Sequence, residues 1–195
     1  MIKKNAANNT GVRITLTGGN SDDGYQLGKP NLVIAFRPFN PLTDEQFQQG
    51  IKIITYQHQR QLPHVKTIDY IMGVWLQPLL KQNKVDDVLY HTNGFVTETP
   101  RSNFFIVTED NSIVTPAKNM LNGITRNKLI EAAKTKFIVE ERDITFAEIK
   151  KAKEAFITST TKVILPIRQI DDYILPIDNP VSVKLFDMMQ KLYDS

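Results

Sequence analysis

Short apolar segments separated by turn-forming residues fill the middle of the chain and restrict the folds open to it. Between residues 88 and 115 these segments are residues 88–90, 95–97, 103–108 and 112–115. Asn93-Gly94 separates the first two, and Asn-Gly is the strongest short-range signal for a β-hairpin. Asp110-Asn111 separates the last two. The pattern predicts an antiparallel meander in this part of the chain.

Strand and helix signals are interspersed through the rest of the sequence. Apolar alternation or short apolar runs predict strands at 12–16, 31–36, 51–56, 137–140, 154–159 and 163–170. Helical spacing predicts helices at 68–84, 125–136, 146–151 and 181–193. Pro78 predicts a kink or an early stop in the first helix. The apolar stripe of the last helix is expected to contain Val183, Phe186, Met189 and Leu192. This mixed order predicts the α+β class with a largely antiparallel sheet.

Composition excludes several kinds of site. The chain has 195 residues, enough to bury a core without covalent cross-links, and no cysteine, which excludes disulfides, thiolate metal sites and a cysteine nucleophile. The spacing of His58, His64 and His91 does not match a zinc signature, so no metal is expected. The 24 basic residues are interleaved with 21 acidic ones, which disfavours a nucleic-acid surface.

Signals for export or membrane insertion are not found in the sequence. Lys3 and Lys4 are followed by Ala6-Ala7-Asn8-Asn9 rather than by the apolar segment of a signal peptide. No apolar run approaches the length of a membrane span. We therefore expect a cytoplasmic protein without a membrane partner.

Two charged side chains occupy positions suited to catalysis. Lys66 comes just before the helix expected from residue 68, and a lysine amine becomes a nucleophile where its surroundings lower its pKa. Glu98 follows a short strand, where a carboxylate can hold a protonated ring nitrogen. Taken singly, a solvated lysine and an exposed strand-end glutamate are the more frequent explanations. Asn103 is expected to turn the chain by bonding its own backbone.

Two further segments are suited to binding an anion. Gly123 and Thr125 stand at the start of an expected helix, where free backbone N–H groups can approach an anion and a threonine at the N-cap adds a hydroxyl. Residues 158–161 are consecutive hydroxyl residues at a strand end and could donate to a phosphate. Helix capping and the strand and turn preferences of threonine and serine explain the same residues without a ligand.

Together these residues form the set that pyridoxal phosphate requires. A lysine holds the aldehyde as a Schiff base, and a carboxylate keeps the pyridine nitrogen protonated so that the ring can accept electrons. A helix start and nearby hydroxyls bind the phosphate.

The order of motifs resembles the class IV (fold type IV) aminotransferases, which include branched-chain aminotransferase, D-amino acid aminotransferase and aminodeoxychorismate lyase. The resemblance extends from about Gly50 to about Ile170. Its motifs are Lys66–Tyr70, Asn93–Phe105, Thr115-Pro116, Leu121–Arg126, Glu141–Ile144 and Thr158–Pro166. It implies pyridoxal phosphate as the cofactor and the large domain of that family as the fold.

The resemblance also implies roles for individual residues. Lys66 matches the lysine that binds the cofactor and moves a proton to and from the substrate Cα. Glu98 matches the partner of the pyridine nitrogen. Tyr70 falls near a position where some members place a tyrosine close to the cofactor. The residues implied in holding the phosphate are Gly123, Ile124, Thr125, Ser159 and Thr160.

The N-terminal part departs from the family pattern, in which the active site lies between a small N-terminal domain and the large one. Residues 1–40 resemble a leader and the tail of the small domain, and residues 41–195 resemble the cofactor-binding large domain. Neither Arg13 nor Arg37 matches the arginine that the small domain contributes to the phosphate. We therefore expect a truncated product, a proteolytic fragment or a natural short form.

The resemblance implies transamination, in which an amino group passes from a branched-chain or D-amino acid to a 2-oxo acid. Two alternatives stay open. One is an elimination of the aminodeoxychorismate lyase kind, which releases pyruvate, and the other is a fragment or subunit without a complete active site. The expected partners are the two small-molecule substrates and a second copy of the chain, because the family builds its sites near a subunit interface.

Overall fold

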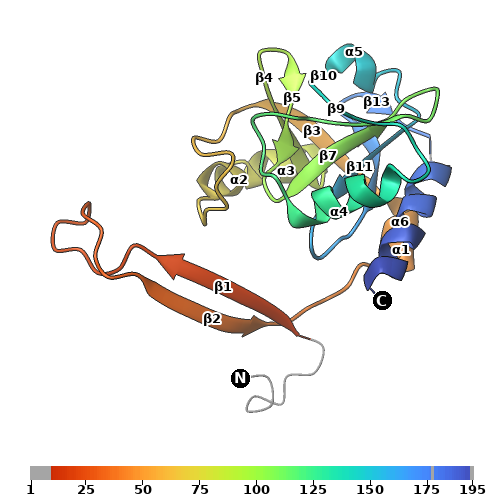
Figure 1. Cartoon of the computed structure of the whole chain (residues 1–195). Helices are drawn as coiled ribbons and strands as arrows, with labels where there is room; N and C mark the ends of the chain where they lie inside the picture. Colours follow the sequence, from red (N-terminus) through yellow and green to blue (C-terminus); the bar gives the residue numbers. More distant parts are fainter. Residues whose placement is uncertain (1–9, 177, 194–195) are drawn as a thin grey trace. The chain divides into compact units, whose positions relative to one another are not determined.

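The computed structural model describes residues 10–176 and 178–193. Contacts divide the chain into two compact units, residues 1–41 and 42–195 (Figure 1). The first unit is one antiparallel hairpin, in which β1 (Gly11–Thr17) pairs along its whole length with β2 (Asn31–Arg37). Its apolar side chains are largely exposed, among them Ile14 and Leu16. Both strands match the segments expected from the sequence.

The second unit contains every other described helix and strand. The helices are α1 (Asp44–Gln49), α2 (Ile71–Trp75), α3 (Gln77–Asn83), α4 (Ile124–Ala133), α5 (Phe146–Ile149) and α6 (Pro180–Tyr193). The strands are β3 (Ile51–Gln57), β4 (Asp87–Thr92), β5 (Phe95–Val96), β6 (Glu98–Thr99), β7 (Ser102–Val107), β8 (Ile113–Thr115), β9 (Val139–Glu141), β10 (Ile144–Thr145), β11 (Glu154–Thr158), β12 (Leu165–Ile170) and β13 (Tyr173–Ile174).

The strands of this unit form one curled sheet in the order β10-β5-β4-β3-β12-β11-β7-β8-β9, with β6 paired to β7 and β13 to β12. The pairs β12–β3, β3–β4 and β8–β9 are parallel. The remaining pairs are antiparallel. The α+β class and the largely antiparallel sheet expected from the sequence are confirmed.

The core lies on both faces of this sheet, and alternate residues of β7 contribute to its two sides. Phe104 and Ile106 belong to the cluster inside the curl, whereas Phe105 and Val107 belong to the cluster under α4 and α6. Successive side chains of a strand point to opposite faces, so a strand buried on both faces is apolar throughout. A third cluster packs α2 and α3 against β4.

The segments between residues 88 and 115 form two separate hairpins, so the single meander expected from the sequence is wrong. β4 and β5 pair through Asn93-Gly94, whose φ angles of 51° and 82° suit a tight turn. β7 and β8 pair across Asp110-Asn111. β3, β12 and β11 separate the two hairpins in the sheet. A turn signal reports only the pairing of sequence neighbours, whereas these intervening strands come from distant parts of the chain.

Three helices differ from the sequence expectations. The helix expected at 68–84 begins at Ile71 and breaks at Leu76 into α2 and α3, because Pro78 lies in the first turn of α3 and lacks a backbone N–H. α1 was not expected, although Thr43 and Gln46 form a capping box at its start. In α6, the expected burial of Met189 is confirmed and Phe186 is partly buried, but Val183 and Leu192 are exposed, and Val181 and Leu185 complete the buried face.

The position of α6 depends on one buried carboxylate at the start of β11. Glu154 accepts hydrogen bonds from the backbone N–H groups of Val181 and Ser182, both at 2.8 Å, and from the Ser182 hydroxyl at 2.6 Å. Replacing it with alanine leaves buried donors without acceptors. We expect Glu154→Ala to lower the free energy of unfolding by about 2–4 kcal/mol in urea denaturation followed by circular dichroism. Glu131→Ala, at an exposed position of α4, is expected to change it by less than about 0.5 kcal/mol. Equal effects of the two substitutions would contradict the role of Glu154.

Among the described residues, no helix has the length and apolar character needed to cross a membrane.

Candidate active site

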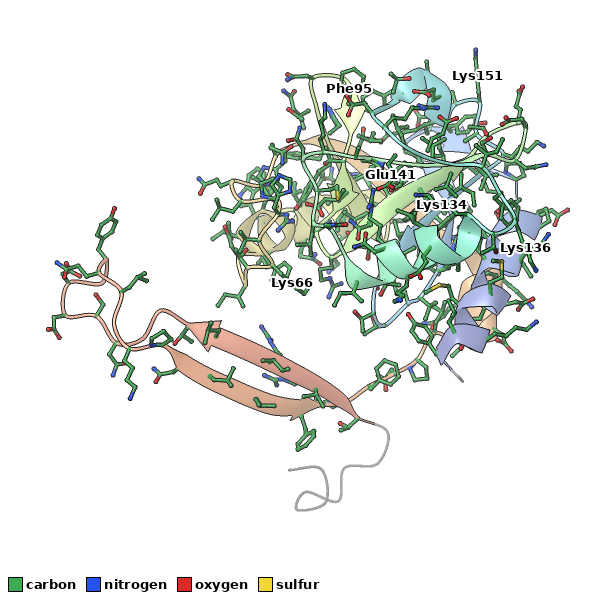
Figure 2. All side chains as sticks on the ribbon, in the orientation of Figure 1. Lys66, Phe95, Lys134, Lys136, Glu141 and Lys151 are labelled. Carbon is green, nitrogen blue, oxygen red and sulfur yellow. The ribbon has the colours of Figure 1, made fainter. Side chains whose placement is uncertain are left out.

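Residues from four distant parts of the chain line one cavity of about 520 Å³, and three of these parts contain candidate residues named from the sequence. Lys66 and Tyr70 come from the segment between β3 and α2, and Tyr70 is the residue immediately before α2. Gly123, Ile124 and Thr125 come from the start of α4, and Ser159 and Thr160 follow β11. The structure therefore brings together every candidate residue named from the sequence except Glu98. Figure 2 shows Lys66 on the α2 side of this unit, away from Lys134 and Lys136.

Glu98 lies beside this cavity, in a smaller one of about 30 Å³ that Lys66 and Tyr70 also line. It is 4% exposed, so the ordinary explanation of an exposed strand-end glutamate does not hold. Its Oε1 accepts from Arg60 Nε at 2.8 Å, and its Oε2 accepts from the Leu121 N–H at 2.9 Å. Burial raises the pKa of the Glu98 carboxyl, while the Leu121 N–H and the charges of Arg60 and Lys66 oppose that rise. The result is a carboxylate held in place beside the lysine.

Arg60 is a residue of this site that the sequence motifs did not single out. Besides its ion pair with Glu98, its Nη2 donates to the carbonyl oxygen of Pro63 at 2.8 Å. Pro63 stands three positions before Lys66, so one guanidinium joins Glu98 to the loop that carries the lysine. Glu98 and Arg60 are 38 residues apart, and no spacing rule connects them.

The start of α4 has the geometry of an anion site, with a correction to its expected cap. The N-cap is Gly123, and Thr125 is the second residue of the helix rather than the cap. The cap residue, Gly123, has no side chain that could bond the first turn, so the positive end of the helix dipole lies at the cavity without a capping group from that residue. Thr125 is nevertheless buried and lines the cavity.

Asn103 shapes this helix start, and the turn expected at that residue is wrong. It lies within β7, and its Nδ2 donates to the carbonyl oxygen of Leu121 at 2.6 Å. A Cβ atom added at Gly123 would overlap Asn103 Oδ1. Glycine is therefore the residue that lets the strand and the helix start approach this closely.

Two buried hydroxyls on the cavity wall point to a bound polar ligand. Ser102 Oγ and Thr158 Oγ1 have no hydrogen-bond partner within the part of the chain that the structure describes. Both residues line the larger cavity, at 6% and 1% exposure. Buried polar atoms are rarely unpaired, and an exception calls for an explanation such as a ligand. With the uncapped helix start and the close approach at Gly123, these hydroxyls fit a phosphate-bearing cofactor, and Lys66 and Glu98 fit its aldehyde and its ring nitrogen.

Gly123→Ala tests the shape of this wall. The new methyl group displaces Asn103, whose amide is fixed by its bond to Leu121, so we expect about 1–3 kcal/mol loss of stability and weaker binding of pyridoxal phosphate in a fluorescence titration. The clash predicts that Asn103→Ala combined with Gly123→Ala costs less than the sum of the single substitutions. Additive losses would show that the two residues do not interact in this way.

Comparison with known proteins assigns the chain to a family. The sequence model described as "Amino-transferase class IV" matches residues 1–170. The chain belongs to the class IV aminotransferases.

Two curated relatives are similar in sequence. A Methanocaldococcus jannaschii protein described as a branched-chain-amino-acid aminotransferase is 32% identical over 176 residues, which cover 84% of this chain and 60% of the relative. The D-alanine aminotransferase of Listeria monocytogenes is 34% identical over 134 residues, which cover 67% of this chain and 46% of the relative. The chain therefore spans about half to three fifths of the length of these relatives.

Solved structures share the fold at lower identity. The branched-chain amino acid aminotransferase of Escherichia coli has a TM-score of 0.86 and 22% identity over 98% of this chain and 68% of its own. The 4-amino-4-deoxychorismate lyase of Pseudomonas aeruginosa has a TM-score of 0.80 and 22% identity over 94% of this chain and 72% of its own. The fold expected from the sequence is confirmed, and it is common to transferases and lyases.

Proposed function

We propose that this chain binds pyridoxal phosphate and catalyses transamination between an amino acid and a 2-oxo acid. The observation that carries the proposal is the convergence of Lys66, the buried Glu98 and the start of α4 on adjoining cavities. A lysine, a fixed carboxylate and an anion site are the protein groups that this cofactor requires. Family membership supports the same chemistry.

Each residue has a stated task in this proposal. The backbone N–H groups at Ile124 and Thr125, with the hydroxyls of Ser159 and Thr160, bind the phosphate. Glu98 holds a proton on the ring nitrogen, and Arg60 and the Leu121 N–H keep its carboxylate oriented. Lys66 attaches the cofactor and afterwards takes and returns the proton at the substrate Cα. When bound, the cofactor withdraws electrons from the bonds at that carbon. Tyr70 forms part of the wall beside Lys66.

Relatives and exposed surface support finer parts of the proposal. The relatives' names point to branched-chain or D-amino acids as donors.

Around α2, the side chains of Ile71, Val74 and Trp75 are 76%, 66% and 66% exposed. Apolar patches of this kind mark interaction surfaces, and a second copy of the chain is the partner that we propose for it. A cytoplasmic location belongs to the same proposal.

The test is the visible spectrum of the purified chain with added pyridoxal phosphate, followed by two assays. We expect an absorption band from a cofactor bound through a lysine, and transfer of the amino group from D-alanine or leucine to 2-oxoglutarate. Release of pyruvate from aminodeoxychorismate without amino transfer would favour the lyase alternative, which the structural likeness to the Pseudomonas enzyme motivates. Saturable cofactor binding without either reaction would favour a fragment that lacks part of its active site. The absence of any band would contradict the proposal.

A further inference from the structure

The charged side chains that line the larger cavity are all cationic. They are Lys66, Arg101 and Lys162, and no aspartate or glutamate is among the residues of its wall. Arg101 lies between β6 and β7, and Lys162 lies between β11 and β12, so two different loops supply these charges beside Lys66. Neither Arg101 nor Lys162 forms an ion pair with any described residue.

A buried carboxylate outside the cavity wall influences Lys162 electrostatically. Asp87, the first residue of β4, is 9% exposed and is not among the residues that line the cavity. Burial lowers the pKa of the Lys162 ammonium. Asp87 and Asp86 oppose this by favouring the charged form, and Arg101 adds to the lowering of that pKa. Lys162 therefore lies within electrostatic range of Asp87, Asp86 and Arg101. The wall of the cavity itself presents Arg101 and Lys162 beside Lys66, and cationic side chains of this kind suit an anion.

The proposed cofactor leaves Arg101 and Lys162 available for a second anion, an inference that rests on the proposed function. Its phosphate is assigned to the start of α4 and the hydroxyls of Ser159 and Thr160, and its aldehyde to Lys66. Every amino acid and 2-oxo acid carries a carboxylate. A charge-assisted hydrogen bond from arginine or lysine is the usual means of holding such a group.

We propose that Arg101 and Lys162 form a subsite that binds a carboxylate of the substrate. The subsite would orient the substrate Cα toward Lys66, because the same cavity contains all three residues. Arg101 supplies an exposed guanidinium, and Lys162 supplies a half-buried ammonium. The cofactor phosphate is also an anion that these side chains could bind. The test must therefore distinguish binding of that phosphate from binding of the substrate carboxylate.

The test measures binding of two small molecules by isothermal titration calorimetry, with and without pyridoxal phosphate. Glutarate carries carboxylates, and glutaramide is its neutral analogue. We expect the unchanged chain to bind glutarate and not glutaramide, and Arg101→Gln and Lys162→Gln each to weaken glutarate binding by about tenfold to a hundredfold. Lys151→Gln removes one exposed charge away from the cavity and is expected to have no effect (Figure 2).

The outcomes separate this inference from the proposed function. Loss of glutarate binding in the variants, with the dissociation constant of pyridoxal phosphate unchanged, supports the subsite. Unchanged glutarate binding in Arg101→Gln overturns it, and so does weaker binding of the cofactor phosphate with glutarate unaffected. Because Arg101 is exposed, its replacement does not disturb the core even if Lys162→Gln destabilises the chain through Asp87. Failure of the unchanged chain to bind pyridoxal phosphate would instead count against the proposed function.

Discussion

Lys66→Ala is expected to abolish covalent attachment of pyridoxal phosphate and to reduce amino transfer by at least about a hundredfold to ten-thousandfold. The substitution removes both the amine that attaches the cofactor and the base at the substrate Cα, and a positioned base alone contributes about that much. The reaction is followed by formation of glutamate from 2-oxoglutarate, and attachment by the visible absorption band. The phosphate site at the start of α4 is unchanged, so we expect the cofactor to bind still, without that band.

The matched control for this prediction is Lys136→Ala. Lys136 is an exposed lysine on a different side of the same unit, as Figure 2 shows. Its replacement removes an equal charge and is expected to leave both the band and the rate unchanged. Turnover by Lys66→Ala at the rate of the unchanged chain would show that another group takes the proton.

Glu98→Gln is expected to lower the rate by about a hundredfold to a thousandfold while covalent attachment at Lys66 persists. The amide keeps the shape of the side chain but loses the charge that holds a proton on the ring nitrogen, and loss of one preorganised electrostatic contact costs about this much. It also leaves Arg60, paired at 2.8 Å in the unchanged chain, with a neutral partner. Single-turnover kinetics with D-alanine or leucine measure the effect.

The control for this carboxylate is Glu131→Gln, at an exposed position of α4. It is expected to retain the full rate, because the residue lies outside both cavities. A Glu98→Gln variant that keeps more than half of the activity would remove Glu98 from the site. Loss of the visible band in that variant would place its effect on cofactor binding rather than on the proton at the ring nitrogen.

Local patterns predicted the parts of the fold that depend on sequence neighbours. Asn93-Gly94 predicted the β4–β5 hairpin, because the turn conformation depends on those two residues. Pro78 predicted the break between α2 and α3. The strand order was not predictable in the same way, since β3 lies between β12 and β4 through pairings of distant segments. In α6, Val181, Leu185 and Met189 share the i, i+4 spacing of a stripe, and packing on β11 and α4 decides which stripe is buried.

In the candidate site, too, the features that depend on sequence neighbours could be predicted, and those that depend on distant segments could not. Lys66, Gly123 and Ser159 were found because each stands at a recognisable break between elements. The burial of Glu98 could not be predicted from the sequence, because it depends on Arg60 and on the Leu121 N–H, which are distant in sequence. The position of Arg101 and Lys162 on the cavity wall was not predicted from the sequence, for a related reason. A charged residue in a loop gives no sign of the cavity it faces until two loops are brought together.

The most direct test of the account is the site of covalent attachment. The chain is incubated with pyridoxal phosphate, reduced with borohydride, digested and analysed by mass spectrometry. Two lysines line the larger cavity, Lys66 and Lys162, so the experiment has a built-in alternative. The account predicts the pyridoxyl group on Lys66 alone. A label on Lys162, or one distributed over the exposed lysines, would contradict it.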